Sequence, residues 1–217
     1  MKNLLHKEFQ LATPVLTFLF LGFAAMTFIP GYPILCGAFF VCFGIFQSYQ
    51  FGREDNDILY TVLLPVKKTD AVKSKYMAAL VLQLAAFSLF SVFTGIRMVF
   101  LYDVRAYESN PLMGANLIFL AFVLLIFAAF NVIFIGGFFK TAYRYGKPFI
   151  CFIAVCFLII GIAETLHHLP GLGWMNDLDH ARSGRQVPFL LAAALLYFTA
   201  TACSCRCSQK HFEQIDL

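Results

Sequence analysis

The amino-acid sequence predicts an all-α, polytopic integral membrane protein. Of the 217 residues, 60% are hydrophobic and only 13% are charged, which is more apolar than a soluble globular domain. Six windows are each long and apolar enough for a helix that crosses a bilayer, which needs about 20 residues. None of the windows alternates apolar and polar residues, as the strands of a membrane barrel do. We therefore expect a single transmembrane domain over residues 1–217.

The six predicted membrane-spanning helices cover residues 11–29, 33–51, 76–100, 116–139, 149–166 and 187–203. The first window does not resemble a cleaved signal peptide. Pro14 stands near its start, no A-x-A-like cleavage site follows it, and the preceding MKNLLHKEFQ carries acidic as well as basic side chains.

The distribution of Lys and Arg predicts the orientation of these helices. If the amino terminus is cytoplasmic, 12 of the 16 basic residues lie inside and only Arg97, Arg105, Arg182 and Arg185 lie outside. This bias predicts a multi-pass protein of the plasma membrane with both termini in the cytoplasm. The basic residues are divided among short loops, so we expect contacts with membrane lipids and none with nucleic acid.

A charged segment, residues 52–75, separates the second and third windows on the predicted cytoplasmic side. Asp55 and Asp57 are candidate caps of a short helix that Pro65 ends. One helix face is apolar and consists of Ile58, Leu59, Val62 and Leu63. Two interpretations remain open: the helix buries these side chains among lipid headgroups, or it presents them to a soluble partner.

Three stretches resemble the short six-helix permeases of type-two ATP-binding-cassette (ABC) exporters of Firmicutes. They are MKNLLHKEFQL at the start, REDNDILYTVLLPVKKTDAVKSKY in the charged segment and SQKHFEQIDL at the end. The resemblance implies an amino-terminal amphipathic connecting helix over residues 2–11 and a cytoplasmic coupling helix over residues 54–64. On this basis the residues that dock a separate ATPase are Glu54, Asp55, Asp57, Ile58, Leu59, Val62 and Leu63.

The resemblance also implies partners for this chain: an ABC ATPase subunit and a second permease chain, identical or different, that completes the substrate path. The chain lacks the phosphate-binding motif G-x-x-x-x-G-K-[ST], because its one Gly-Lys pair, Gly146-Lys147, is followed by Pro148. We therefore expect no enzyme activity and no cofactor here, with ATP and Mg²⁺ bound by the ATPase. Residues 167–187 are either an outer loop or the re-entrant element that the family has there.

Polar and charged side chains inside the windows are costly and often functional, and we single out four of them: Gln83, Arg97, Asn131 and Glu164. Gln83 and Asn131 are expected to bond neighbouring helices, with a place on the substrate path as the alternative. Arg97 and Glu164 lie near outer helix ends. They are expected either to pair with each other or to leave Arg97 extended toward the headgroups.

The sequence ETLHH places Glu164 close to His167 and His168, and Asp177, Asp179 and His180 follow it. A metal centre in a helical bundle needs such a motif on two helices, and this chain has one, so we expect no metal site. Two other functions remain as alternatives to the exporter permease: a self-sufficient channel or secondary carrier, and an intramembrane metalloenzyme. The 27 Phe residues would suit an amphipathic or lipid-like cargo, but they would equally suit helices that face lipid.

Overall fold

The computed structural model describes residues 2–63, 65–101, 104–108, 110–141, 144–178 and 183–215. Within these ranges the chain forms helices and no strand, which confirms the predicted all-α class. The first helices are α1 (Lys2–Lys7), η1 (Glu8–Ala12), α2 (Val15–Leu21), η2 (Gly22–Phe28), α3 (Cys36–Glu54), α4 (Asp57–Leu63), α5 (Lys68–Phe100) and α6 (Arg105–Glu108). They are followed by α7 (Leu117–Ala129), η3 (Phe130–Ile135), α8 (Gly136–Lys140), α9 (Gly146–Leu166), η4 (Gly173–Asn176), η5 (Ser183–Arg185) and α10 (Val187–Glu213).

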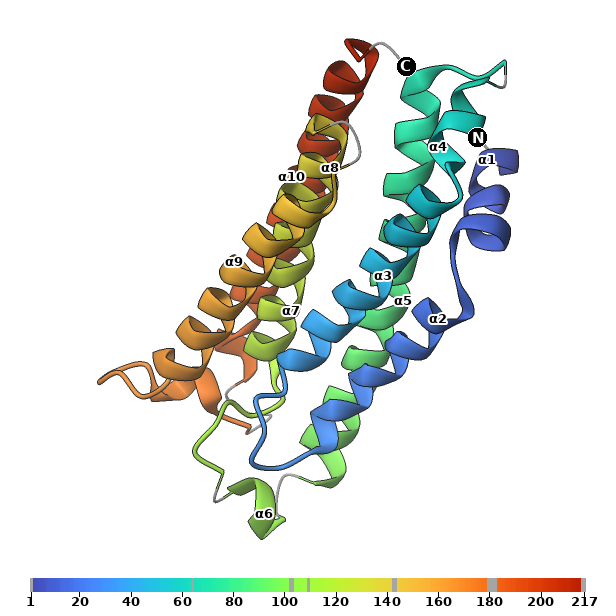
Figure 1. The fold of residues 1–217 in the computed structure, drawn as a ribbon. Coiled ribbons are helices and arrows are strands. Elements are labelled where there is room, and N and C mark those ends of the chain that lie inside the picture. Colours follow the sequence, from blue (N-terminus) through green and yellow to red (C-terminus); the bar gives the residue numbers. More distant parts are fainter. Residues whose placement is uncertain are drawn as a thin grey trace.

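The long helices run side by side and form two groups, one of α2, α3 and α5 and the other of α7, α8, α9 and α10 (Figure 1). Both chain termini lie at the same end of the bundle, together with α1 and α4. We call this end the termini end. The other end, which carries α6 and the segment between α9 and α10, is the opposite end.

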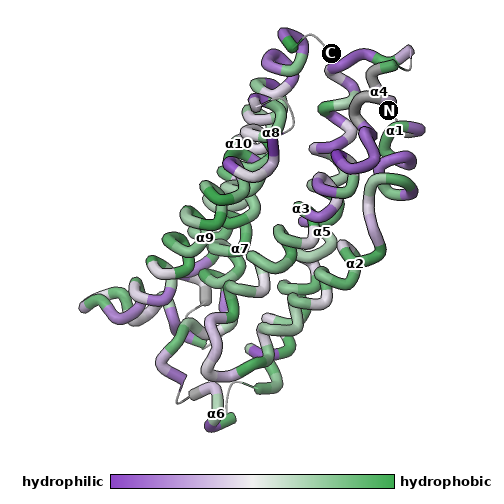
Figure 2. The backbone as a smooth tube through the Cα atoms, viewed as in Figure 1, coloured by the Kyte–Doolittle hydropathy of each residue, from purple (hydrophilic) through white to green (hydrophobic). Residues whose placement is uncertain are grey.

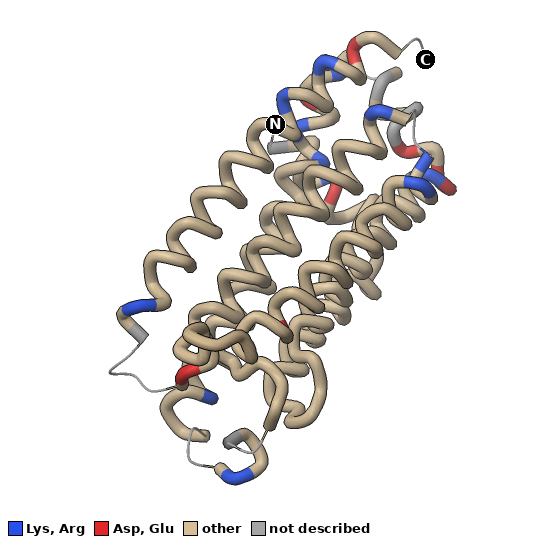
Figure 3. Tube along the Cα trace, turned by 90° about the vertical axis from the view of Figure 1, so that its left-hand side faces the viewer, with Lys and Arg blue, Asp and Glu red and all other residues tan. Residues whose placement is uncertain are grey.

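The middle of the bundle is hydrophobic and its two ends are polar (Figure 2). Lys, Arg, Asp and Glu gather at these ends and are scarce along the helices between them (Figure 3). A protein with an apolar belt between two charged ends is suited to a bilayer, whose hydrocarbon core is about 30 Å thick.

Within the described ranges, four helical segments are long and apolar enough to cross a membrane: Lys68–Phe100, Leu117–Lys140, Gly146–Leu166 and Val187–Glu213. A fifth arises if Asn3–Ala12 and Val15–Phe28, which meet at 91°, are counted as one broken span. Helix α3 covers the second predicted window but carries Gln47, Ser48 and Gln50 toward its end. The chain is thus a polytopic membrane protein, while the number six stays a prediction.

The bend after residue 12 sets the direction of the amino-terminal helix. Thr13 is extended, with φ −103° and ψ 105°, and Pro14 follows it with φ −68° and ψ 153°. Proline disfavours helical geometry in the residue before it, so the helix stops there. If α2 crosses the membrane, α1 and η1 at about a right angle to it lie along the membrane surface. Together α2 and η2 are only about 24 Å long, which is short for a complete span.

Phenylalanine rings pack between the two groups of helices and within the second group. Phe46 of α3 stacks on Phe149 of α9 with ring centroids 3.8 Å apart, and it meets Phe134 of η3 edge-on at 5.4 Å. Phe130 of η3 meets Phe152 of α9 at 5.1 Å. Such pairs add about 0.5–1.5 kcal/mol to the free energy of burial. Much of the Phe content therefore serves internal packing, so it is weak evidence about cargo.

A close approach joins α2 to α3. The hydroxyl of Thr17 donates to the carbonyl oxygen of Gly44 at 2.8 Å, and a Cβ at Gly44 would collide with the side chain of Phe20. Glycine is needed there because no side chain fits between the two backbones.

The predicted coupling helix is shorter than residues 54–64. Glu54 is the last residue of α3, and Asp55 ends α3 as its C-cap, so the prediction that Asp55 caps the next helix is wrong. Asn56 turns the chain with a left-handed φ of 52°, and α4 begins at Asp57. The last described residue before Pro65 is Leu63; Leu64 lies outside the described residues.

Candidate functional site

Helix α4 presents apolar side chains to the surroundings at the termini end. Leu63 is 75% exposed and Tyr60 is 66% exposed, and the two lie one helical turn apart. Thr61 is buried, so α4 has one face turned into the protein. The side chains of Ile58, Leu59 and Val62 lie outside the described part of the chain.

Four charged side chains, one of them in α4 itself, hold the buried face of α4 against α1, η1 and α5. Nζ of Lys75, in α5, is 2.7 Å from Oε2 of Glu8 in η1 and 2.8 Å from Oδ2 of Asp57 in α4. Nζ of Lys7 is 2.6 Å from Oδ1 of Asp57 and 3.2 Å from Oε1 of Glu8. Two cations and two carboxylates therefore alternate around one centre. We call these four residues the Lys75 cluster.

Thr61 connects the Lys75 cluster to the backbone of α4. Nζ of Lys7 donates to Oγ1 of Thr61 at 2.7 Å, and the Thr61 hydroxyl donates to the carbonyl oxygen of Asp57 at 2.6 Å. The amino-terminal helix, α4 and α5 thus meet in one network of charge-assisted hydrogen bonds, the stronger class of hydrogen bond.

The Lys75 cluster is shielded from solvent. Lys75 is 6% exposed and Glu8 is also buried. Burial alone would raise the pKa of the Asp57 carboxyl, but the charges of Lys75 and Lys7 and the hydrogen bonds from both ammonium groups bring it below its ordinary value. Asp57 is therefore ionised at neutral pH, and the four charges balance.

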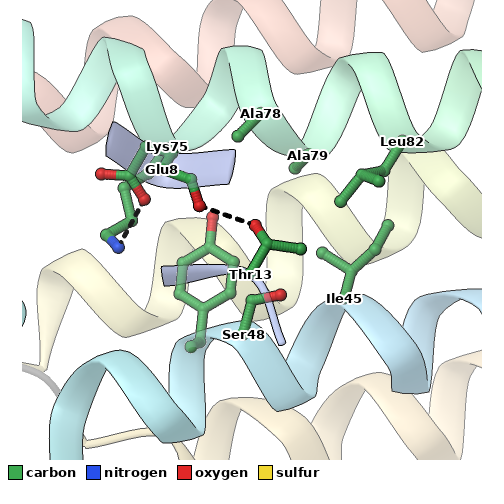
Figure 4. Close-up of a pocket in the computed structure, with 9 residues that line it drawn as sticks. Glu8, Thr13, Ile45, Ser48, Lys75, Ala78, Ala79 and Leu82 are labelled. Carbon is green, nitrogen blue, oxygen red and sulfur yellow. Dashed lines mark hydrogen bonds and ion pairs between the residues drawn. The ribbon is translucent and has the colours of Figure 1, made fainter. Parts of the chain in front are cut away.

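A cavity of about 20 Å³ adjoins the cluster and is lined by Glu8, Thr13, Ser48, Tyr49 and Lys75 among others (Figure 4). This volume is large enough for one water molecule. The hydroxyl of Tyr49 is buried and has no hydrogen-bond partner among the described residues, while the Tyr49 ring lies 5.9 Å from Nζ of Lys75. The surroundings of Lys75 are thus polar on one side and aromatic on the other.

Sequence reasoning missed most of this site. Asp57 was predicted as a helix cap and as an ATPase-docking residue; in the structure the Asp57 carboxylate binds two lysines of this chain. Lys7, Glu8 and Lys75 were used only to count charges. One signal was present: Lys75 is followed directly by the apolar run of α5, where an unpaired lysine is expensive.

A second polar group is buried between α5, η3 and α10. Nε2 of Gln83 donates to Oδ1 of Asn131 and Nδ2 of Asn131 donates to Oε1 of Gln83, both at 2.9 Å. Nδ2 of Asn131 also donates to Oγ1 of Thr201 at 2.9 Å, and the Tyr197 hydroxyl donates to Oε1 of Gln83 at 2.8 Å. Both amides are satisfied by protein partners, so they join helices.

Tyr76 extends this group toward the termini end. Its hydroxyl lies 2.8 Å from Oγ of Ser204 and 2.9 Å from Oγ of Ser208, both in α10. Ser204 also donates to the backbone carbonyl of Asn131 at 3.1 Å, within the π-helical turn η3. The partners on α10 recur at positions 197, 201, 204 and 208, one face of a helix, and this polar stripe was a readable signal in the sequence.

Comparison with known proteins places this architecture in a family. The family model described as ABC-2 family transporter protein matches residues 3–213. The chain belongs to the ABC-2 transporter family. No curated protein and no solved structure matches the chain. The match covers nearly the whole chain, so this protein is a membrane permease of the ABC transporter class, a transport component that is not itself an enzyme.

At the opposite end of the ABC-2 permease, the surroundings of Arg97 contradict both predictions made for its side chain. It is 1% exposed, so it does not extend to the headgroups, and it forms no ion pair with Glu164. Instead Nη1 donates to the carbonyl oxygen of Thr27 at 2.7 Å, and the guanidinium lies over the Tyr107 ring at 4.3 Å. Packing by η2 and α6 encloses the side chain there, and the ring face attracts its charge.

Glu164 also has a structural partner: its Oε2 accepts a hydrogen bond from the backbone N–H of Met113 at 2.8 Å. Nε2 of His167 lies 3.1 Å from the carbonyl oxygen of Pro111. Among the described residues no three His, Cys, Asp or Glu side chains are grouped as a metal site would require. Asp179 and His180, which the sequence offered as further ligands, lie outside the described residues.

Proposed function

We propose that this chain is the membrane-spanning subunit of an ABC exporter and that α4 is the coupling helix that docks on a separately encoded ATPase. The observation that carries the proposal is the combination found in α4. One face exposes Tyr60 and Leu63, and the other is fixed through Asp57 and Thr61 to two further elements.

An exposed apolar face together with a rigid attachment suits a helix that transmits movement from a bound partner to the bundle. It suits less well a helix that only lies among lipid headgroups. A helix that only lies in the membrane surface needs a hydrophobic face and no rigid attachment to the bundle. Helix α4 has an attachment made of short charge-assisted bonds, which resist displacement. A force on Leu63 would therefore displace α5 and the amino-terminal helix together with α4, and α4 itself would bend little.

The orientation follows from the charge distribution. We place the termini end in the cytoplasm and the permease in the plasma membrane, in agreement with the excess of Lys and Arg in the segments at that end. Helix α4 then faces the compartment that contains ATP. The ATPase would bind ATP and Mg²⁺, and a second permease chain would complete the substrate path.

The test replaces the two exposed side chains of α4. Tyr60→Asp combined with Leu63→Asp removes apolar surface that a docked ATPase would bury, and a fully buried Leu contributes about 1.5–3 kcal/mol. We expect recovery of the ATPase with the purified permease to fall by about tenfold or more. The measurement is co-purification from cells that also express a candidate ABC ATPase subunit, chosen as one that the wild-type permease retains.

The matched control is Leu169→Asp, an exposed leucine at the opposite end that an ATPase in the cytoplasm cannot reach. It should leave recovery of the ATPase unchanged. If the double variant also retains the ATPase fully and inserts normally, α4 is not the docking element. A loss of the ATPase with both proteins would point to general misfolding, which the melting temperature of each permease would reveal.

A further inference from the structure

A groove runs along the surface between η3 and α8 on one side and α10 on the other. Its volume is about 500 Å³, and it reaches from Ala200 to His211 along α10. Eleven helical steps correspond to about 16 Å, close to the hydrocarbon depth of one leaflet, about 15 Å. Figure 1 shows α8 and α10 side by side near the termini end. We call this the α8–α10 groove.

The part of the α8–α10 groove that is farther from the termini end, which we call its deep part, is apolar. Val132, Ile133 and Ala200 line it, and Val132 is exposed. The hydroxyls of Ser204 and Ser208 also belong to its wall, but both are engaged by Tyr76. This part therefore offers a hydrocarbon chain an apolar bed and few competing polar groups.

The part of the groove that is nearer the termini end, which we call its shallow part, is basic. Lys140, at the end of α8, is exposed and forms no ion pair with a described carboxylate, and none of the described Asp and Glu residues lines the groove. His211 stands on the facing wall, with Nδ1 2.9 Å from the carbonyl oxygen of Cys207, which leaves Nε2 for another partner. Basic sites between transmembrane helices at the cytoplasmic side suit anionic lipid headgroups.

We propose that the α8–α10 groove binds an anionic phospholipid, with its phosphate beside Lys140 and one acyl chain in the apolar deep part. The proposal rests on the orientation given above, in which the termini end faces the cytoplasmic leaflet. A second permease copy is a poorer fit. A two-fold contact here would bring the same basic residues of both copies together, with no carboxylate in the groove to neutralise them.

The native cysteines make the site testable. Cys207 lines the groove, whereas Cys151 is exposed on α9 and is not part of it. The permease would be purified in neutral detergent, stripped of lipid and supplied with phosphatidylglycerol or phosphatidylcholine of the same chains. Maleimide labelling of each cysteine is then followed by mass spectrometry of its peptide. We expect phosphatidylglycerol to slow labelling of Cys207 about fivefold more than phosphatidylcholine does. The labelling rate of Cys151 should be the same with either lipid.

Two variants separate a headgroup site from general lipid contact. Lys140→Gln should remove the difference between the two lipids at Cys207. Lys147→Gln, which removes an exposed lysine outside the groove near the start of α9, should preserve it. The wild-type permease is used without the ATPase, so the result does not depend on whether α4 docks one.

Three outcomes would overturn the proposal. Equal protection of Cys207 by both lipids would show that the groove recognises hydrocarbon alone. Absence of protection by either lipid would show that no phospholipid binds there. Cross-linking of Cys207 between two copies by a bifunctional maleimide, at the same rate with and without phosphatidylglycerol, would show that a second copy covers the groove.

Discussion

Replacing Lys75 by Met should destabilise the permease strongly, because it leaves two buried carboxylates facing a single lysine. Lys75 is the more buried of the two lysines that contact both carboxylates, and it lies 2.7 Å from Glu8 and 2.8 Å from Asp57. The two carboxylates therefore lie within about 6 Å of each other, where like charges interact. Methionine keeps the length and volume of the side chain, so the change removes charge with little loss of packing.

The size of the effect follows from the burial of the cluster. Removing one partner of a buried ion pair costs about 3–5 kcal/mol, since the remaining charge stays buried without compensation. Lys7 remains beside both carboxylates, at 2.6 Å from Asp57 and 3.2 Å from Glu8, so we take the lower end of this range. For a chain of this length a loss of about 3 kcal/mol lowers the melting temperature by roughly 6–12 °C.

The assay is thermal unfolding of the purified permease in one detergent at one heating rate. Lys73→Met is the matched control, because Lys73 is on the same helix, is about half exposed and forms only a 3.9 Å contact with Asp70. It should change stability by less than about 0.5 kcal/mol. Adding Asp57→Asn to Lys75→Met restores charge balance and should recover part of the loss. Equal melting temperatures for the Lys75 and Lys73 variants would refute the view that the cluster holds α4.

The pH dependence of stability and the packing between helices can be tested in the same way. The folded-state pKa of Asp57 is lowered, so the ionised carboxylate stabilises the fold. This stabilisation is complete above the unfolded pKa of about 3.9 and is lost as pH falls through the lower folded value. From pH 5 downward the melting temperature of the wild type should therefore fall faster than that of Asp57→Asn. Gln83→Leu should destabilise by about 1–3 kcal/mol, because Oδ1 of Asn131 loses its donor and the Tyr197 hydroxyl loses its acceptor. A double-mutant cycle with Asn131→Leu should give a coupling of about 0.6–1.7 kcal/mol in thermal unfolding. Gly44→Leu should lower the yield of folded permease in size-exclusion chromatography, whereas Gly161→Leu, where a Cβ would meet nothing within 4 Å, should not.

The helices themselves were largely predictable because their signals are local. A run of apolar residues, the four-residue spacing in α4 and Pro65 act within one or two turns, so the sequence shows them directly. The break at Thr13 and Pro14 was not predicted, because the first window was drawn through it from residue 11. The boundary at Asn56 was not readable in the same way. Glu54 and Asp55 look like the acidic start of a helix, but α3 continues through Glu54 and uses both residues to end.

The Lys75 cluster and the surroundings of Arg97 could not be predicted from local patterns. The cluster joins residues 7, 8, 57 and 75, which meet only after the amino-terminal helix has turned away from α2 and α4 has folded back against α5. Arg97 meets Thr27 and Tyr107 from distant parts of the chain. Arg97 is a basic residue near a helix end, and this suggested that its side chain extends to the headgroups. Whether it can do so depends on the neighbouring elements that pack over it, which the local sequence does not show.

The position of Lys75 next to Tyr76 suggests how a movement of α4 would spread through the permease. Lys75 binds α4 and η1, whereas Tyr76 binds Ser204 and Ser208 of α10, so α5 connects α4 to the second group of helices within a single turn. The alternative route through α3 is weaker, because α3 and α4 are separated by a break at Asp55 and by the left-handed Asn56, where the helical hydrogen-bond ladder does not continue. An ATPase that displaces α4 would therefore act on α5 through buried ion pairs, and α5 would shift against α10 through the hydroxyl contacts of Tyr76. The contact between α5 and α10 is therefore where a displacement of α4 would first reach the second group of helices.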